Sequence, residues 1–226
     1  MITPPLPQSR NCPPGLMLFS LIYGGMVTLG GVLGAKQVSI GPLAVEAGIF
    51  PFLTLVATSS GIAELYGKDT ANRLARFGLV PLVMAIALTF FVLQLPTDPG
   101  MYEPAKAAFP VILGQSGRMM AAGICAYAVS LTLNIWIFSK LRAATGRFAG
   151  LRGFIAAALS QIVDTMIFIT ISFYGVREIF GILVGQALAK VVLSAVVVPI
   201  VIWIVVKLGH FLDGNAENAS NRAQER

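Results

Sequence analysis

Six long apolar segments constrain the fold of this 226-residue chain more than any other feature. A helix needs about 20 apolar residues to cross the hydrocarbon core of a bilayer. Only 12% of the residues are charged, against about 25% in soluble domains. The sequence therefore predicts an all-α, polytopic membrane protein with six transmembrane helices. The segments lie at about residues 16–34, 49–66, 76–95, 119–139, 154–173 and 179–206, and the last is long enough to tilt or to extend past the bilayer.

The lysines and arginines between these segments predict the orientation, because cytoplasmic loops are enriched in them. Eleven lie in the two tails and in the loops after the second and fourth segments, whereas four lie in the other loops. Both termini are therefore expected in the cytoplasm. This topology also accounts for the net charge of +6 without a nucleic-acid partner. The expected organisation is a Pro-rich cytoplasmic tail (1–15), a six-helix transmembrane domain (16–208) and a second cytoplasmic tail (209–226).

The connections and the glycine motifs give weaker signals. Residues 39–46 are too short to span a bilayer, and both a re-entrant loop and a surface loop are consistent with them. Four prolines in the loop 96–118 disfavour a continuous helix there. The GxxxG motifs at 30–34 and 181–185 predict close helix packing, with dimerisation as a secondary reading. Cys12 and Cys125 lie in unlike positions and indicate no disulfide.

Three ionisable residues lie inside the apolar segments: Glu64, Asp164 and Lys190. Such a residue costs roughly 2.5–3.5 kcal/mol at the centre of a span, so it normally has a partner or a purpose. On the second, fifth and sixth segments, polar or aromatic side chains share a helix face with the ionisable residue. The fourth segment has a similar polar face without a charged residue. These faces are Ser60 and Glu64 on the second segment; Tyr127, Ser130, Asn134 and Phe138 on the fourth; Ser160, Gln161, Asp164, Thr165 and Phe168 on the fifth; and Gln186, Lys190 and Ser194 on the sixth.

The depths of these charges predict one ion pair. Asp164 lies roughly 14 Å from the outer end of the fifth segment, and Lys190 roughly 17 Å into the sixth, at 1.5 Å per residue. A short connection makes these two helices antiparallel neighbours. Glu64 and Asn134 lie deeper, roughly 22 Å into inward-running spans.

The residues alone leave structural readings open beside the functional ones. The pair Asp164–Lys190 also fits a purely structural salt bridge that orders the bundle. Glu64 also fits a carboxylate at a helix end that reaches interfacial water. Gln161, Asn134 and Gln186 also fit interhelical hydrogen bonds, a common use of such residues in membranes.

Several classes of function lack their residues in this sequence. The only histidine, His210, lies beyond the last segment, so a Ser–His protease has no intramembrane base. No metal-ligand cluster and no Walker-type glycine loop is present. We therefore expect no cofactor and no enzyme, and a small-solute permease fits better than either.

Several motifs resemble the queuosine precursor transporter family, also called VUT or putative vitamin uptake transporters. The resemblance covers about residues 16–208 and is carried by FPF (50–52), ELYG (64–67), NIWIFSKL (134–141), SQIVDT (160–165), the run 168–175, and GQ (185–186) followed by KVV (190–192). It implies a six-helix architecture similar to the substrate-binding components of vitamin importers. It also implies uptake of 7-deazaguanines, such as 7-cyano-7-deazaguanine, across the bacterial inner membrane.

The resemblance implies a substrate-binding set of Glu64, Asn134, Gln161, Asp164, Gln186 and Lys190. A carboxylate accepts the adjacent N–H donors of a deazaguanine, Lys190 or a glutamine amide donates to its carbonyl, and Phe168, Tyr127 and Trp136 are candidates for its ring faces. Many family members carry an aspartate where this chain has Ser60 or Asn134, which bears on coupling and substrate. The alternative function is a non-transporting membrane subunit that binds a small solute for an energising partner. The preferred deazaguanine, the energy coupling and the oligomeric state are not predicted.

Overall fold

The computed structural model describes residues 12–40, 43–114, 117–142, 148–175 and 178–224. Within these residues, six helical stretches are long and apolar enough to cross a membrane. The predicted all-α membrane fold with six spans is therefore confirmed. The six are α1 (Pro14–Leu33), α2 (Ile49–Tyr66), α3 (Lys68–Phe77) followed by α4 (Leu79–Gln94), α6 (Gly117–Lys140), α8 (Ala149–Phe173) and α9 (Phe180–Gln224).

Three connections differ from the expectation. The described residues of the segment 39–46 belong to an antiparallel pair of strands, β1 (Gln37–Ile40) and β2 (Leu43–Glu46), with Gln37 paired to Glu46. The loop after the second span is helical, because α3 places its alanines inward and its charges outward. The long outer connection contains a short helix, α5 (Glu103–Leu113), which has Pro104 in its first turn, where a missing N–H costs no helical bond.

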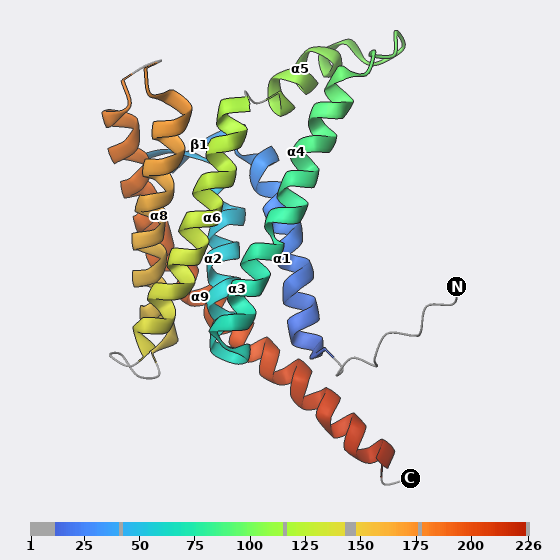
Figure 1. Cartoon of the computed structure of the whole chain (residues 1–226), viewed down its shortest axis with the longest axis vertical. Helices are drawn as coiled ribbons and strands as arrows, with labels where there is room; N and C mark the ends of the chain where they lie inside the picture. Colours follow the sequence, from blue (N-terminus) through green and yellow to red (C-terminus); the bar gives the residue numbers. More distant parts are fainter. Residues whose placement is uncertain (1–11, 41–42, 115–116, 143–147, 176–177, 225–226) are drawn as a thin grey trace, which may run out of the picture.

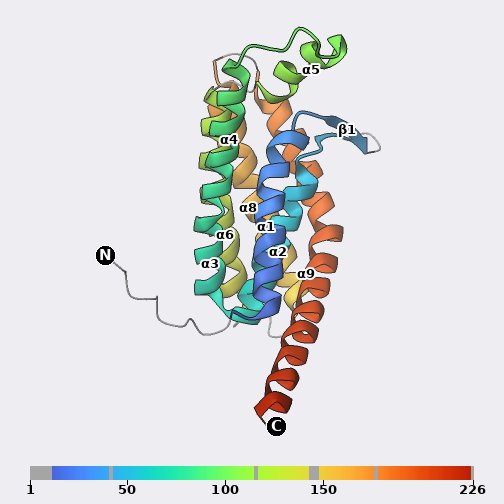
Figure 2. The same ribbon diagram turned by 90° about the vertical axis from the view of Figure 1, so that its right-hand side faces the viewer.

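The last helix is longer than the predicted segment that ends at residue 206. α9 continues without a break to Gln224 and projects beyond the bundle (Figures 1 and 2). Asp213 on this extension accepts hydrogen bonds from the Tyr66 hydroxyl, at 2.8 Å, and from the Gly15 N–H, at 2.9 Å. The extension is therefore tied to α2 and α1 where it leaves the bundle.

The helices form a bundle with α2 at its centre. α2 packs against α1, α6, α8 and α9, and α8 packs between α6 and α9. Twelve of its 18 residues are buried, whereas none of the α4 side chains is. Figure 1 shows the hairpin and α5 at one end of the bundle, with the start of α1 and the α9 extension at the other. We call these the hairpin end and the terminus end.

The two GxxxG motifs behave differently. At the hairpin end a Cβ on Gly48 would lie 2.9 Å from the Gly30 carbonyl oxygen and 3.1 Å from the Gly34 Cα. The first motif therefore lets the start of α2 approach the backbone of α1, as close packing predicts. A Cβ on Gly185 would meet nothing within 4 Å, so the close packing predicted at this position is wrong.

Candidate functional site

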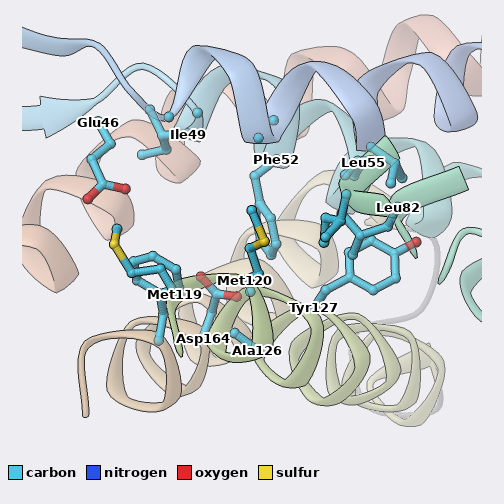
Figure 3. A pocket seen from close by; sticks show the side chains of 18 of the residues that line it. Glu46, Ile49, Phe52, Leu55, Leu82, Met119, Met120, Ala126, Tyr127 and Asp164 are labelled. Atoms are coloured by element: carbon cyan, nitrogen blue, oxygen red, sulfur yellow. The ribbon is translucent and has the colours of Figure 1, made fainter. Parts of the chain in front are cut away.

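A cavity of about 220 Å³ lies between α1, α2, α4, α6, α8 and α9 and extends from the middle of the bundle to the hairpin end. Its walls are mostly apolar, and its charged residues are Glu46, Asp164 and Lys190. The close-up in Figure 3 shows the carboxylates of Glu46 and Asp164 directed into the same space. An apolar cavity with a few polar groups is the usual form of a small-molecule site.

The Asp164–Lys190 ion pair predicted from depth is present. Lys190 Nζ donates to Asp164 Oδ2 at 3.1 Å, and the Ser130 hydroxyl donates to Asp164 Oδ1 at 3.2 Å. Three helices, α6, α8 and α9, therefore hold one carboxylate. Each carboxylate oxygen accepts more than one hydrogen bond and the ammonium has three donors, so both groups retain capacity for a ligand.

The second carboxylate, Glu46 at the end of β2, is a residue that the sequence analysis missed. Gln186 Nε2 donates to Glu46 Oε1 at 3.2 Å, which brings the predicted glutamine to the rim of the cavity. A glutamate in a connection is ordinary in a membrane protein, so composition gave no signal. The alternation of apolar side chains at Val38, Ile40, Leu43 and Val45 did indicate the strands that place it.

The apolar walls come from aromatic, methionine and glycine residues. Phe52, Met119, Met120 and Phe168 line the cavity, and Tyr127 contributes its ring. Figure 3 shows the Tyr127 hydroxyl pointing away from Asp164. It donates to the Ala75 carbonyl at 3.3 Å and shares a hydrogen bond of 3.0 Å with the Tyr23 hydroxyl. Two of the three predicted ring faces, Phe168 and Tyr127, therefore line the cavity.

Trp136, the third predicted ring face, does not line this cavity. Its side chain is 48% exposed on the bundle surface, with Lys140 Nζ 5.9 Å from the ring centre. It lies two residues after Asn134, and a helix that turns 100° per residue directs such a neighbour to another face. Trp136 is therefore on the outside of α6.

Glycines widen the cavity beside the aromatic walls. A Cβ added at Gly30 or at Gly123 would meet nothing within 4 Å, although both residues line the cavity. The space at these positions is therefore created by the missing side chains rather than by poor packing of larger ones.

A layer of fully buried polar side chains lies deeper in the bundle. Asn134 Nδ2, with two N–H groups, lies within hydrogen-bond distance of three acceptors: the hydroxyls of Ser59 and Ser60 at 3.4 and 3.2 Å, and the Val56 carbonyl at 3.4 Å. The Ser130–Asp164 contact sets the register of the antiparallel α6 and α8, so Asn134, about 6 Å further along α6, is level with Gln161. Asn134 and Gln161 are both 0% exposed.

Some buried polar atoms in this layer and next to Asp164 lack hydrogen-bond partners among the described residues. They are Asn134 Oδ1, both amide atoms of Gln161 and Thr165 Oγ1. A buried polar group without a partner costs about 1–3 kcal/mol. Such atoms indicate a place for a bound polar molecule or for buried water.

Glu64 is not brought to the cavity. It lies nine residues beyond Leu55, the last α2 residue of the cavity wall, which is about 14 Å along the helix. Arg152 Nη2 donates to Glu64 Oε2 at 2.8 Å, and the Arg152 guanidinium lies 4.7 Å from the Phe138 ring centre. Asn134 and Phe138, predicted to share one face of α6, therefore have different partners: Asn134 contacts Ser60, and Phe138 contacts Arg152.

Arg152 is the second functional candidate that sequence reasoning missed. The sequence places Arg152 among the eleven cations of the tails and cytoplasmic loops. In the structure it lies in the first turn of α8 and is 0% exposed. A buried guanidinium needs a counter-charge, and Glu64 provides it. The pair ties α2 to α8 at the terminus end, where the cavity does not reach.

Comparison with known sequences decides the family. The profile of the putative vitamin uptake transporter family matches residues 46–204. The chain belongs to this family. The matched region begins at Glu46 and contains Asp164, Lys190 and the whole of α2, α6 and α8. The six apolar helices and the family together indicate a multi-pass membrane protein of a transporter family.

A curated protein with a similar sequence is a probable queuosine precursor transporter from Bacillus subtilis (strain 168). It is 28% identical to this chain over 145 residues, a match that spans 62% of each protein. The chain thus covers less than two thirds of that relative. No solved structure matches the chain.

Proposed function

We propose that this protein carries 7-deazaguanine precursors of queuosine, such as 7-cyano-7-deazaguanine, unchanged across the bacterial inner membrane into the cytoplasm. The observation that carries this proposal is the Asp164–Lys190 pair on the wall of an otherwise apolar cavity with aromatic faces. The name of the Bacillus subtilis relative supports the same class of solute.

The chemistry of the pair suits the polar edge of a deazaguanine. The ring N–H and the exocyclic amine are adjacent donors, which one carboxylate accepts in bidentate fashion. The ring carbonyl next to them needs a donor, and Lys190 has two N–H groups beyond the one that Asp164 accepts. Phe52 and Phe168 supply apolar faces for the flat ring. The cavity lies below the roughly 300–1,000 Å³ of drug-sized ligand pockets, which favours a small bicyclic solute.

The distribution of cations supports an orientation in which the hairpin end faces outward and both tails are cytoplasmic. In this orientation the cavity extends toward the outside. The contacts Glu64–Arg152, Tyr66–Asp213 and Gly15–Asp213 close the cytoplasmic half. The described arrangement then corresponds to an outward-open state, and transport requires these contacts to break while the hairpin end closes.

The buried polar layer suits the path between the two halves. Asn134 and Gln161 lie one turn below Asp164, and their unpartnered amide atoms match the donors and acceptors of a base that moves inward. Gln186 adds an amide at the rim through its bond to Glu46. The predicted substrate-binding residues thus contact the solute one after another along its path rather than all at once. Glu64 acts at the closed cytoplasmic end.

The test is the queuosine content of tRNA in a bacterium that cannot make deazaguanines, at nanomolar external 7-cyano-7-deazaguanine. The chain should restore queuosine, and Asp164→Asn should lower initial uptake about thirtyfold, the equivalent of about 2 kcal/mol for charge-assisted hydrogen bonds. Asp98→Asn, in the exposed outer connection, is the matched control.

Uptake by the purified chain in liposomes separates a transporter from a subunit that needs an energising partner. Normal uptake by Asp164→Asn at an equal amount of membrane protein would contradict the proposed binding site. Absence of restoration by the wild-type chain would contradict the proposed solute.

A further inference from the structure

Glu46 is held firmly at the rim of the cavity although it follows a short strand. Its backbone is paired with Gln37, and the next residue, Ala47, donates its N–H to the Lys36 carbonyl at 2.8 Å. Val45 and Ala47 on either side are buried. Because Gly48 then packs directly on the α1 backbone, the backbone at Glu46 has a defined position, and Gln186 donates to its carboxylate.

No cation among the described residues forms an ion pair with Glu46. Asp164 has Lys190 as its counter-ion, whereas the partner of Glu46 is the neutral amide of Gln186. Among the described residues Glu46 takes part in no salt bridge, and its Oε2 atom has no hydrogen-bond partner. Arg118, near the same end, donates to the carbonyls of Ile171 and Tyr174.

The charged residues that line the cavity therefore have a formal charge of −1, from two carboxylates and one ammonium. A partly buried carboxylate without a counter-ion favours a cationic ligand, because screening by water is weaker there than at the surface. A solute that carries one positive charge would therefore neutralise the charge of the cavity lining.

The position of Glu46 relative to Lys190 specifies where that charge lies on the solute. Gln186 and Lys190 are four residues apart on α9, which places them about 6 Å apart along one face. In a 7-deazaguanine the substituent at C7 is next to the ring carbonyl. A solute whose carbonyl is bound by Lys190 therefore directs its C7 substituent along α9, and the cavity extends toward Gln186 and Glu46.

We propose that Glu46 forms a cation subsite that selects 7-deazaguanines with a primary ammonium on the C7 substituent, such as the 7-aminomethyl form, over neutral ones. This inference rests on the proposed function and assigns specificity within the same cavity. Glu46 recognises the ammonium, and Gln186 is a positioning residue that holds the carboxylate.

The test compares two nearly isosteric solutes, 7-aminomethyl- and 7-hydroxymethyl-7-deazaguanine, in uptake by proteoliposomes. Wild-type protein should favour the charged solute about tenfold, since hydrogen bonds between charged groups are about twice as strong as neutral ones. Glu46→Gln should bring the ratio close to one, because it removes the charge that favours the ammonium. The ratio is independent of the amount of folded protein in each preparation.

Glu103→Gln is the matched control, because Glu103 lies at the same end but is highly exposed and paired with Lys106 outside the cavity. It should leave the ratio unchanged. Equal uptake of both solutes by the wild type, or an unchanged ratio in Glu46→Gln, would overturn the subsite while the proposed function stands. Loss of both solutes in Glu46→Gln would also overturn it, since Glu46 would then not be a selector. Uptake of neither solute by the wild type would contradict the proposed function itself.

Discussion

The two ends of the bundle use the same residue types in opposite ways. At the hairpin end, glycines such as Gly30 and Gly123 leave space, and the carboxylates of Glu46 and Asp164 face a cavity. At the terminus end, a Cβ added at Gly61, Gly153 or Gly209 would lie within 3.0 Å of a side-chain atom of a neighbouring helix. The carboxylates there, Glu64 and Asp213, are engaged by Arg152, Tyr66 and Gly15.

The role of a glycine or of a charged residue in this bundle therefore depends on what packs beside it. A glycine creates a binding space where no helix fills it, and a close helix contact where one does. A carboxylate that lines a cavity is accessible to a ligand, whereas one paired with a fully buried guanidinium outside the cavity ties helices together. The hairpin end therefore contains a cavity, whereas the terminus end is closed by packing, hydrogen bonds and an ion pair in this structure.

Breaking the Glu64–Arg152 pair should have the largest effect on stability. Glu64→Ala leaves the fully buried Arg152 without its counter-charge, and removing one partner of a buried pair costs about 3–5 kcal/mol. Thermal unfolding of the detergent-solubilised protein measures the loss. The double variant Glu64→Leu/Arg152→Met should recover most of it, because an apolar pair of similar volume replaces the ions. A double variant as unstable as Glu64→Ala would contradict this account.

Matched glycine substitutions sharpen the contrast between the ends. Gly61→Val should destabilise the protein by about 1–3 kcal/mol, because its Cβ would lie 2.5 Å from Val205 Cγ1. Gly123→Val should leave the unfolding temperature nearly unchanged and lower deazaguanine uptake, because the added methyls fill the cavity. Similar effects of both substitutions on stability would show that the two ends do not differ in packing.

The smallest effect is expected where α9 leaves the bundle. Tyr66→Phe removes one hydrogen bond to Asp213, which contributes about 1 kcal/mol. Faster proteolysis within residues 207–224, at unchanged protection of the rest of the chain, is the expected result. Unchanged proteolysis would show that the Gly15–Asp213 bond alone holds the extension.

The sequence was informative wherever a residue broke the apolar pattern of a span. Asp164 and Lys190 stand out against their neighbours, and counting residues from a shared connection predicted their contact, now seen at 3.1 Å. The six spans were predictable for the same reason, since lipid demands long apolar helices. The predicted spans agree with the structure to within a few residues, except that the third begins earlier and the sixth continues further along the chain.

Glu46 and Arg152 were not predictable, because charges are ordinary in a strand or near a helix end. Their importance comes from what packs beside them. The hairpin places Glu46 over the cavity, and α2 and α6 bury Arg152. The helical extension to Gln224 was missed because residues 207–224 are polar, so hydrophobicity marks no continuation of the span, and its contacts with Tyr66 and Gly15 are tertiary.

We propose that the cavity at the hairpin end faces outward and binds a 7-deazaguanine. The direct measurement is labelling of Gly123→Cys by a membrane-impermeant maleimide in right-side-out vesicles, in a Cys12→Ser/Cys125→Ser background. Gly123 lines the cavity, and a side chain there meets open space. We expect rapid labelling that is slowed by added 7-aminomethyl-7-deazaguanine. Labelling only from the cytoplasmic side, or labelling that the solute does not change, would contradict the account.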